Sequence, residues 1–355
     1  MNEATDIRRG DEIDETRLKE WLAPITGKSI EKIIIRQFAG GYSNLTYQII
    51  INDDIKWVLR KPPKGANIKS GHDMAREYKI IKALYPEYTK VPRPVAYCED
   101  STIIGTEFYI MDNVDGWILR AHKKADSYPD KKIMHQIYTL FTENFVALHA
   151  LDYTKCGLDT LGNPQQYPER QISGWTRRYE AAKTDEIRSV ATLYKWLNEN
   201  IPILSRPSLI HNDYKYDNII FDKEGKELIA ILDWEMSTIG DPLMDLGSTL
   251  GYWVNHDDPD WLQEIGLSPT NMSDHPTREN LLHDYADKSG LDPGNGVFYY
   301  AYGMLKLAVI AQQIYARYKA GHTSDPRFAG LIKVVEMCGL MGTQAIQKQK
   351  LDHLF

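Results

Sequence analysis

One short segment, residues 211–218, constrains this chain more than any other feature of its sequence. It reads His-Asn-Asp-Tyr-Lys-Tyr-Asp-Asn, and strand patterns follow it on both sides of a turn at 223–226. Asp213 begins the segment's loop, Asn218 stands where the first strand starts, and Asp233 follows the second strand. Because a hairpin returns the chain to its starting point, we expect Asp233 to lie beside Asn218.

These residue types suit the transfer of a phosphoryl group from ATP to a hydroxyl group. That reaction needs a carboxylate to orient and deprotonate the hydroxyl, oxygen ligands for Mg²⁺, and cations near the phosphates. Asp213 is the candidate base, and Lys215, two residues later, is within reach of the transferred phosphate. Asn218 and Asp233 offer an amide oxygen and a carboxylate oxygen, which are ligands that Mg²⁺ prefers. We therefore predict catalytic roles for Asp213 and Lys215 and a metal site at Asn218 and Asp233.

Strand and helix patterns divide the chain into a β-rich first part and a mostly helical second part. Strands are expected at residues 33–35, 45–51, 55–60 and 107–111, and again at 218–222 and 227–232. Helices are expected from Met74 to Tyr85 and at residues 131–151, 175–182, 188–198 and 295–319. We predict an α+β, bilobal fold. Residues 1–113 form a small N-lobe with an antiparallel sheet and a helix, and residues 114–355 form a larger, mainly helical C-lobe.

The composition excludes several classes of protein. A chain of 355 residues with 43% hydrophobic and 26% charged residues is typical of globular proteins and is long enough for two cores. Its net charge of -7 favours no nucleic-acid partner, since duplex binders carry a basic field. Three widely spaced cysteines and a polar N-terminus without a signal-like apolar stretch favour a cytoplasmic location. Lys306, Gln312 and Gln313 interrupt the longest apolar run, 298–316, so we expect a buried helix there and no membrane span.

The motifs, taken together and in order, resemble the aminoglycoside phosphotransferase family, whose members have a kinase-like fold. They are similar to the branch found as stand-alone bacterial proteins and fused to acyl-CoA dehydrogenases in animals. The motifs that carry the resemblance are GYSNLTY at 41–47, VLRKPP at 58–63, DMARE at 73–77, FYIM at 108–111, HNDYKYDN at 211–218, ILDWE at 231–235 and GDPL at 240–243. The resemblance implies that Asp213 is the catalytic aspartate and that Asn218 and Asp233 are the magnesium ligands.

The same resemblance implies a nucleotide site in the N-lobe. The turn that contains Gly41, Ser43 and Asn44 matches the loop that covers the ATP phosphates. Asp112 and Val114 match the connector whose backbone pairs with adenine. These five residues are therefore predicted to bind the cofactor.

One position departs from the family pattern. The third strand carries a lysine in the family, oriented by a glutamate that Glu77 matches, but here Arg60 stands at that position with Lys61 beside it. Strand alternation places Arg60 and Lys61 on opposite faces of the sheet. A guanidinium fork bridges a carboxylate and a phosphate, so Arg60 is the predicted phosphate-binding cation, with Lys61 as the alternative.

Four residues around the loop have other expected roles. His211 is expected to brace the loop backbone, and Asp245 to tie the loop down. Asp241 and the proline after it are expected to begin a helix. Glu235 either lines the site or holds the backbone.

These patterns predict an ATP- and Mg²⁺-dependent phosphotransferase that acts on the hydroxyl group of a small molecule. The resemblance implies a 4-hydroxyacyl-CoA as the acceptor, and an aminoglycoside, choline or another small alcohol is the alternative. A protein kinase is disfavoured, because only six residues separate Asp233 from Gly240, too few for a segment that docks a polypeptide. A catalytically silent ATP-binding protein is the third class, and the filled catalytic positions speak against it.

Overall fold

The structure, a computed structural model, describes residues 4–38, 44–63, 73–121, 128–323 and 325–355 and groups the chain into two compact units. Unit 1 contains Met1–Ile118, Lys155–Leu158 and Asn218–Ser237. Unit 2 contains Leu119–Thr154, Asp159–Asp217 and Thr238–Phe355. The predicted division of the chain at residue 113 stays a prediction. The units differ from it chiefly because the hairpin after Asn218 belongs with the first part of the chain.

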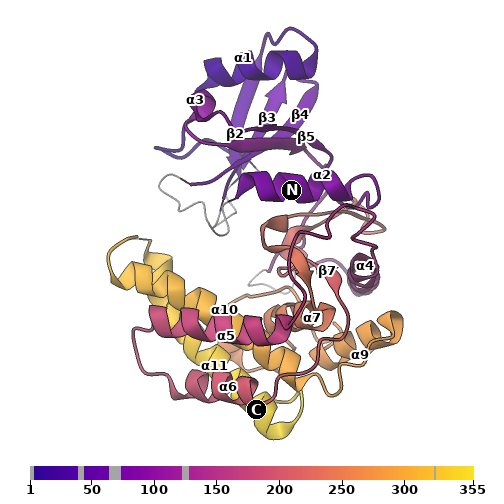
Figure 1. Cartoon of the computed structure of the whole chain (residues 1–355), viewed down its shortest axis with the longest axis vertical. Helices are drawn as coiled ribbons and strands as arrows, with labels where there is room; N and C mark the ends of the chain where they lie inside the picture. The colour runs from indigo at the N-terminus through magenta and orange to yellow at the C-terminus, as the bar shows by residue number, and fades with distance from the viewer. Residues whose placement is uncertain (1–3, 39–43, 64–72, 122–127, 324) are drawn as a thin grey trace. The chain divides into compact units, whose positions relative to one another are not determined.

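Unit 1 is built on a six-stranded sheet in which every neighbouring pair is antiparallel (Figure 1). The strand order is β1-β2-β3-β4-β6-β5. The strands are β1 (Ala4–Thr5), β2 (Ile33–Phe38), β3 (Leu45–Ile51), β4 (Ile55–Lys61), β5 (Pro94–Cys98) and β6 (Phe108–Asp112). The four strands predicted for this region are confirmed, whereas β1, which has two residues, and β5, which begins with a proline, were not predicted.

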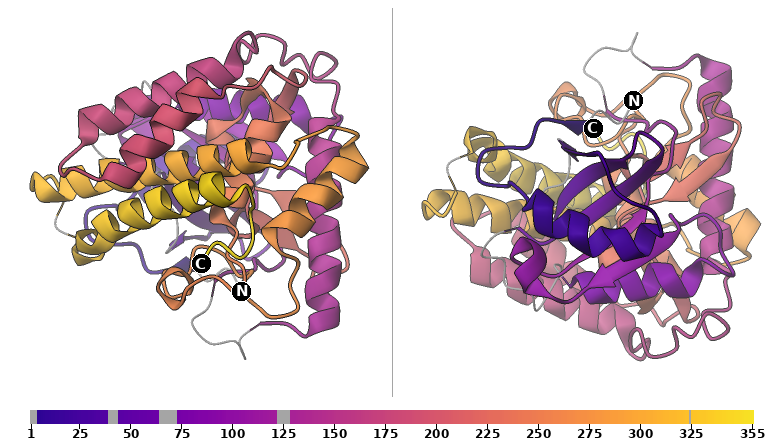
Figure 2. Two further views of the ribbon diagram at one scale, coloured as in Figure 1. Left: turned by 90° about the horizontal axis from the view of Figure 1, so that it is seen from below. Right: turned by 90° about the horizontal axis from the view of Figure 1, so that it is seen from above.

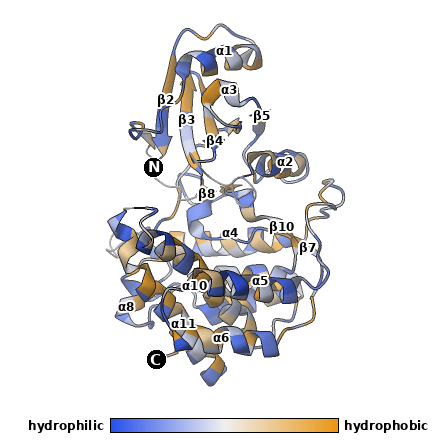
Figure 3. Ribbon diagram, turned by 60° about the vertical axis from the view of Figure 1, so that its left-hand side comes forward, coloured by the Kyte–Doolittle hydropathy of each residue, from blue (hydrophilic) through white to orange (hydrophobic). Residues whose placement is uncertain are grey.

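Helix α1 (Glu15–Thr26) covers the hydrophobic core of unit 1. Asp14 caps its first turn by accepting a hydrogen bond from the Arg17 amide, and the helix ends at Gly27 in the left-handed conformation. It carries both hydrophilic and hydrophobic residues (Figure 3), and Leu18 and Leu22 are fully buried. They pack in one cluster with sheet residues that include Tyr47, Ile49, Ile51, Leu59, Phe108 and Ile110.

Helix α2 (Met74–Leu84) brings an acidic residue into this unit, and α3 (Ser101–Ile104) is a single short turn. The Asp73 carboxylate caps α2 by accepting from the Arg76 amide at 2.8 Å. The face of α2 that buries Ile80 and Ile81 also buries Glu77 completely. A carboxylate in that environment needs a charged partner.

The hairpin predicted after the loop is present in unit 1 and is shorter than expected. It consists of β8 (Ile219–Phe221) and β9 (Leu228–Ile231), which pair antiparallel. A 3₁₀ turn, η2 (Tyr216–Asn218), precedes it, and another, η3 (Trp234–Met236), follows. The amide of Leu232 donates to the Asn218 carbonyl at 2.8 Å, so the chain before Asp233 returns to Asn218 as predicted.

Unit 2 is mainly helical. Its helices are α4 (Lys131–His149), α5 (Tyr167–Ala182), α6 (Arg188–Glu199), α7 (Pro242–Tyr252), α8 (Asp260–Gln263), α9 (Arg278–Ser289), α10 (Val297–Lys319) and α11 (Leu331–Lys348), with a 3₁₀ turn at η4 (Pro326–Gly330). Strands β7 (Ser208–Ile210) and β10 (Thr238–Gly240) pair antiparallel. The four helices predicted in this part are confirmed. Helix α5 begins well before Trp175, and Pro168 stands in its first turn, where proline is tolerated.

Close contact between α7 and α10 positions the residues that follow. Helices α10 and α11 lie side by side, with α5 and α6 next to them (Figure 2, left). On the α7 side, a Cβ atom added to Gly303 would overlap the carbonyl oxygen of Gly247, and one added to Gly251 would lie 2.9 Å from the backbone of Gly303. Only glycine at these positions allows the two helix backbones to approach so closely.

The stretch Pro326–Lys348 is long and apolar enough to cross a membrane by length and composition alone. It contains α11, whose glycines lie against other helices of unit 2. A Cβ on Gly339 would meet Val190 of α6 at 2.8 Å, and one on Gly342 would meet Leu193 at the same distance. These contacts pack one face of α11 against α6.

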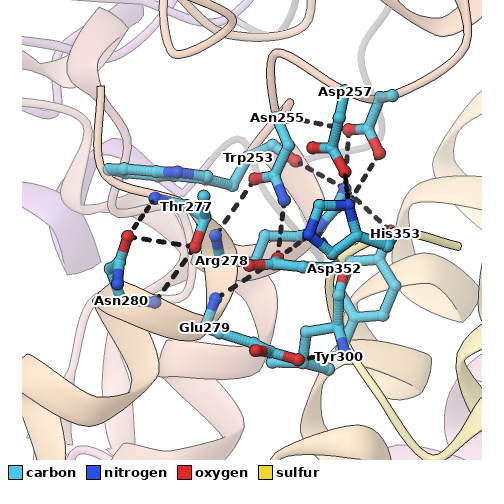
Figure 4. A network of polar contacts seen from close by, with 12 residues as sticks. Trp253, Asn255, Asp257, Thr277, Arg278, Glu279, Asn280, Tyr300, Asp352 and His353 are labelled. Carbon is cyan, nitrogen blue, oxygen red and sulfur yellow. Dashed lines mark hydrogen bonds and ion pairs between the residues drawn. The ribbon is translucent and has the colours of Figure 1, made fainter. Parts of the chain in front are cut away.

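A buried arginine attaches the last residues of unit 2 to its helices (Figure 4). Arg278, at the start of α9, is fully buried and donates to both carboxylate oxygens of Asp258, at 2.8 and 2.6 Å. Its Nε donates to the carbonyl of Leu351 at 2.8 Å, and it lies over the ring of Tyr300. Asp352 accepts from the Asn255 side chain at 2.6 Å. These bonds fix the segment after α11.

Candidate active site

Arg60 is the centre of a charged cluster in unit 1. It lies on β4, where its backbone pairs with Tyr109 of β6, and its side chain is 9% exposed. Nη1 lies 3.2 Å from Oε1 of Glu77, and Nη2 lies 2.9 Å from Oδ1 of Asp233. Glu235 Oε2 is 3.7 Å from Nη2. We call Arg60, Glu77, Asp233 and Glu235 the Arg60 cluster. It joins a strand, a helix and the segment after the hairpin.

The neighbouring cation, Lys61, points elsewhere. Its Nζ lies 5.4 Å from the centre of the Tyr47 ring, and the residue is 3% exposed. Alternation along β4 gives the two cations opposite faces, and the face of Arg60 is the one that Glu77 occupies. The predicted pairing of Arg60 with Glu77 is therefore present.

Burial and charge set the protonation of the cluster. Burial raises the pKa of Glu77 to about 6, and the guanidinium of Arg60 opposes that rise. Burial also disfavours the charged form of Arg60, but Glu77 and Asp233 outweigh it, so the pKa of Arg60 lies well above its usual value. At neutral pH both partners are charged, and the amide of Trp234 donates to Glu77 at 3.2 Å as well.

The segment that carries Asp233 is held by its backbone. Asp233 adopts the left-handed conformation, with φ 68°. Arg76 donates to the carbonyl of Glu235 at 2.8 Å and also to the carbonyl of Ser237. The Glu235 carboxylate accepts from the side chain of Asn44 at 2.6 Å. Glu235, whose role the sequence left open, thus connects the Arg60 cluster to the predicted phosphate loop.

The remaining predicted nucleotide residues are less closely grouped. Gly41 and Ser43 lie outside the described residues. Asp112 ends β6, and its carboxylate pairs with Arg93 at 2.7 Å. The Asp112 amide donates to the Arg93 carbonyl at 2.9 Å, so a bond from that amide to adenine would need this one to break. Val114 is half-buried in the connector after β6.

The donors near the hairpin fit Mg²⁺ by their chemistry. Asn218 is 9% exposed, and the side chain of Asp233 is 30% exposed. Within the described ranges, no group of three or more His, Cys, Asp or Glu is placed to hold a metal ion. One carboxylate oxygen and one amide oxygen supply part of the ligand set that Mg²⁺ needs. Phosphate oxygens and water would supply the rest.

The Asp213 loop, residues 211–217, lies in unit 2. The Lys215 ammonium bridges both carboxylate oxygens of Asp213, at 3.0 and 2.9 Å, and lies 4.5 Å from the centre of the Tyr252 ring. Burial disfavours the charged form of Lys215, but the charge of Asp213 outweighs it and raises the pKa of Lys215. Burial, followed by the Asp213 charge, raises the pKa of Tyr252 as well.

Buried side chains hold the backbone of this loop. The amides of His211 and Asn212 donate to the two carboxylate oxygens of Asp245, at 2.6 and 2.8 Å. The amide of Asp213 donates to Nδ1 of His211 at 3.2 Å. The predictions that His211 braces the loop and that Asp245 ties it down are confirmed. Asp241 caps α7 by accepting from the Leu243 amide, also as predicted.

Two residues of these two sites, Arg76 and Tyr252, had no predicted role, and Lys306 was noted only as a cation that interrupts an apolar run. Arg76 lies inside the DMARE motif, but only its neighbour Glu77 was assigned. Tyr252 ends α7 with no pattern that distinguishes it. Lys306 had a visible signal, because a lysine that interrupts a long apolar run needs a polar partner inside the core.

One protein family and several relatives match most of this chain. The family described as "Phosphotransferase enzyme family" matches residues 34–279. Acyl-CoA dehydrogenase family member 11 of Rattus norvegicus is 36% identical over 300 residues, which cover 82% of this chain and 38% of the relative. Member 10 of Mus musculus is 34% identical over 322 residues, 90% of this chain and 30% of the relative. The chain therefore spans well under half the length of these relatives.

Solved structures share the fold. A candidate aminoglycoside phosphotransferase from Ralstonia eutropha is 28% identical, with a TM-score of 0.77 over 95% of this chain and 99% of its own. The GDP complex of aminoglycoside 2′-phosphotransferase-IIIa is 17% identical, with a TM-score of 0.60 over 92% of this chain and 98% of its own. The predicted α+β kinase-like fold is confirmed.

Proposed function

The chain belongs to the phosphotransferase enzyme family, and on this premise we propose that it transfers the γ-phosphoryl group of ATP to a hydroxyl group of a small molecule. The observation that carries the proposal is the contact of Arg60 with both Glu77 and Asp233. Three segments far apart in the sequence bring one buried guanidinium and two carboxylates together. Such a cluster suits a nucleotide whose phosphates attract the cation and whose metal ion attracts Asp233.

Each site has its own part in the proposed reaction. In unit 1, Arg60 binds the nucleotide phosphates, and Glu77 keeps the guanidinium in place. Asn218 and Asp233 would hold Mg²⁺, which neutralises phosphate charge when bound. In unit 2, Asp213 accepts the proton of the acceptor hydroxyl, and Lys215 stabilises the charge on the transferred group.

For the acceptor we propose a 4-hydroxyacyl-CoA. The named relatives include acyl-CoA dehydrogenase family members, which supports a CoA ester.

A side-by-side assay tests the proposal. ADP release is measured with 4-hydroxyvaleryl-CoA, kanamycin and choline, each with Mg²⁺ and with EDTA. We expect Mg²⁺-dependent release that is fastest with the CoA ester. Preference for kanamycin or choline would contradict the CoA ester but keep the phosphotransferase, whereas ADP release with none of a wider set of alcohols would contradict the phosphotransferase itself.

A further inference from the structure

Lys306 is a buried cation for which the proposed reaction has no direct use. It lies on α10 and is 4% exposed. Burial lowers its pKa to about 8, although the charges of Asp213 and Asp245 oppose that shift. Removing an ammonium group from water is unfavourable unless strong acceptors compensate. The acceptors of Lys306 therefore indicate what the residue does.

Those acceptors belong to the Asp213 loop and to α7. The Lys306 Nζ donates to the carbonyl oxygen of Asn212, and it donates to Oγ of Ser248 at 3.1 Å. The Asn212 carbonyl and the Asp213 amide are the two ends of one peptide group. Because a peptide group is planar, a bond that holds its carbonyl also holds the orientation of its N–H.

The other end of that peptide group is held as well. The Asp213 amide donates to the His211 ring at 3.2 Å, while Asn212 adopts the left-handed conformation with φ 66°. That conformation is uncommon for a residue with a side chain and persists only when its surroundings impose it. Lys306 at the carbonyl and Asp245 at the Asn212 amide, 2.8 Å away, grip the residue from both sides.

The packing of α10 on α7 explains how a lysine reaches this point. Gly303, in contact with Gly247, lies one helical turn before Lys306. Helix α7 carries both Asp245 and Ser248. The same close approach of two helices thus delivers an acceptor for the loop amides and a donor for the loop carbonyl.

We infer that Lys306 is a positioning residue for the proposed catalytic base. It fixes the peptide group before Asp213 and so sets the direction of the Asp213 side chain. The inference rests on the proposed function for its catalytic meaning, but the ordering of the loop is measurable without activity.

The test compares Lys306→Met with Ser248→Ala in the full chain. Lys306→Met keeps a side chain of similar length and removes the donor. Ser248→Ala removes the other acceptor of Lys306 and leaves the bond to Asn212. Hydrogen–deuterium exchange of peptides that span residues 209–216 is measured, together with kcat, the KM for ATP and the thermal midpoint.

We expect Lys306→Met to speed amide exchange in the loop at least tenfold and to lower kcat about 10- to 100-fold, the effect of losing one charge-assisted hydrogen bond. The KM for ATP should stay within about twofold, because the Arg60 cluster is untouched. Ser248→Ala should change kcat less than about threefold. Should Lys306→Met fail to fold, Lys306→Leu, which also removes the donor, takes its place with the same expectation.

Unchanged loop exchange in the folded Lys306 variant would overturn the inference. So would equal losses of kcat in the Lys306 and Ser248 variants, which would indicate general destabilisation of the α7–α10 contact. A wild-type chain that releases no ADP contradicts the proposed function instead, and the exchange measurement still decides whether Lys306 orders the loop.

Discussion

The Arg60 cluster of unit 1 and the Asp213 loop of unit 2 hold their functional groups by different means. In the cluster, oppositely charged side chains hold one another in place, and the single guanidinium of Arg60 faces three carboxylates. In the loop, buried side chains hold the backbone, through Asp245 at two amides and Lys306 at a carbonyl.

The difference suits two tasks. Under the proposed function, a cluster of ion pairs would exchange partners when an anionic nucleotide arrives, because a phosphate can replace a carboxylate at the guanidinium. A base must keep one direction through the reaction, and a loop fixed by buried hydrogen bonds keeps it. Changes in the Arg60 cluster should therefore act on nucleotide binding, and changes around the Asp213 loop on turnover.

The largest expected effect is a loss of turnover without a loss of ATP binding, in a variant of the Asp213 loop. Asp213→Ala should lower kcat about 10³- to 10⁴-fold, since it removes the proton acceptor, and should leave the Kd for ATP within about threefold. ADP release and calorimetric ATP binding measure the two quantities. Asp217→Asn, which changes a carboxylate of the same loop without a predicted role, is the control. Normal turnover in Asp213→Ala would mean that another group is the base.

A substitution in the Arg60 cluster should instead weaken ATP binding. Arg60→Met should raise the Kd for ATP at least tenfold and lower the free energy of unfolding by about 3 kcal/mol, because Glu77 would stay buried without its cation. Chemical denaturation and calorimetry measure both. Lys61→Met is the control on the other face of β4, and a larger loss of ATP binding there would make Lys61 the phosphate-binding cation.

A smaller effect tests the support under the Asp213 loop. Gly303→Ala places a Cβ atom against the Gly247 carbonyl and should lower the free energy of unfolding by about 1–3 kcal/mol, with a fall in kcat. Gly174, on α5, has nothing within 4 Å of an added Cβ, so Gly174→Ala should be neutral or slightly stabilising. Equal stability of the two variants in urea would show that α7 and α10 do not need this contact.

The smallest effect is a pH dependence in the Arg60 cluster. Glu77 binds its proton more tightly in the folded chain, where its pKa is about 6, than in the unfolded chain, where its pKa is the ordinary 4.5. The folded state therefore gains a proton in this window, and the free energy of unfolding should fall by at most about 2 kcal/mol as the pH rises from 4.5 to 6.

Glu77→Gln should remove that part of the slope when unfolding is followed in urea between pH 4.5 and 7. The exposed Glu87→Gln should keep it. If both variants retain the wild-type slope, Glu77 does not titrate in this range.

The sequence alone determined the local structure and the identity of most candidate catalytic and binding residues. Periodicity and turn residues predicted β3 with its observed ends, α2 and the hairpin, because these depend on short-range burial patterns and backbone preferences. Asp213, Asn218 and Asp233, along one loop and hairpin, predicted a phosphotransferase, since that reaction needs a carboxylate base and oxygen ligands for Mg²⁺ that converge in space.

Only the tertiary structure decided which other residues hold these candidate groups in place. Glu235 meets Asn44, Arg60 meets Asp233, and Lys306 meets Asn212 across 94 to 191 positions of the chain. No local pattern encodes such contacts, because they arise when whole elements pack and buried charges take the partners that packing leaves within reach.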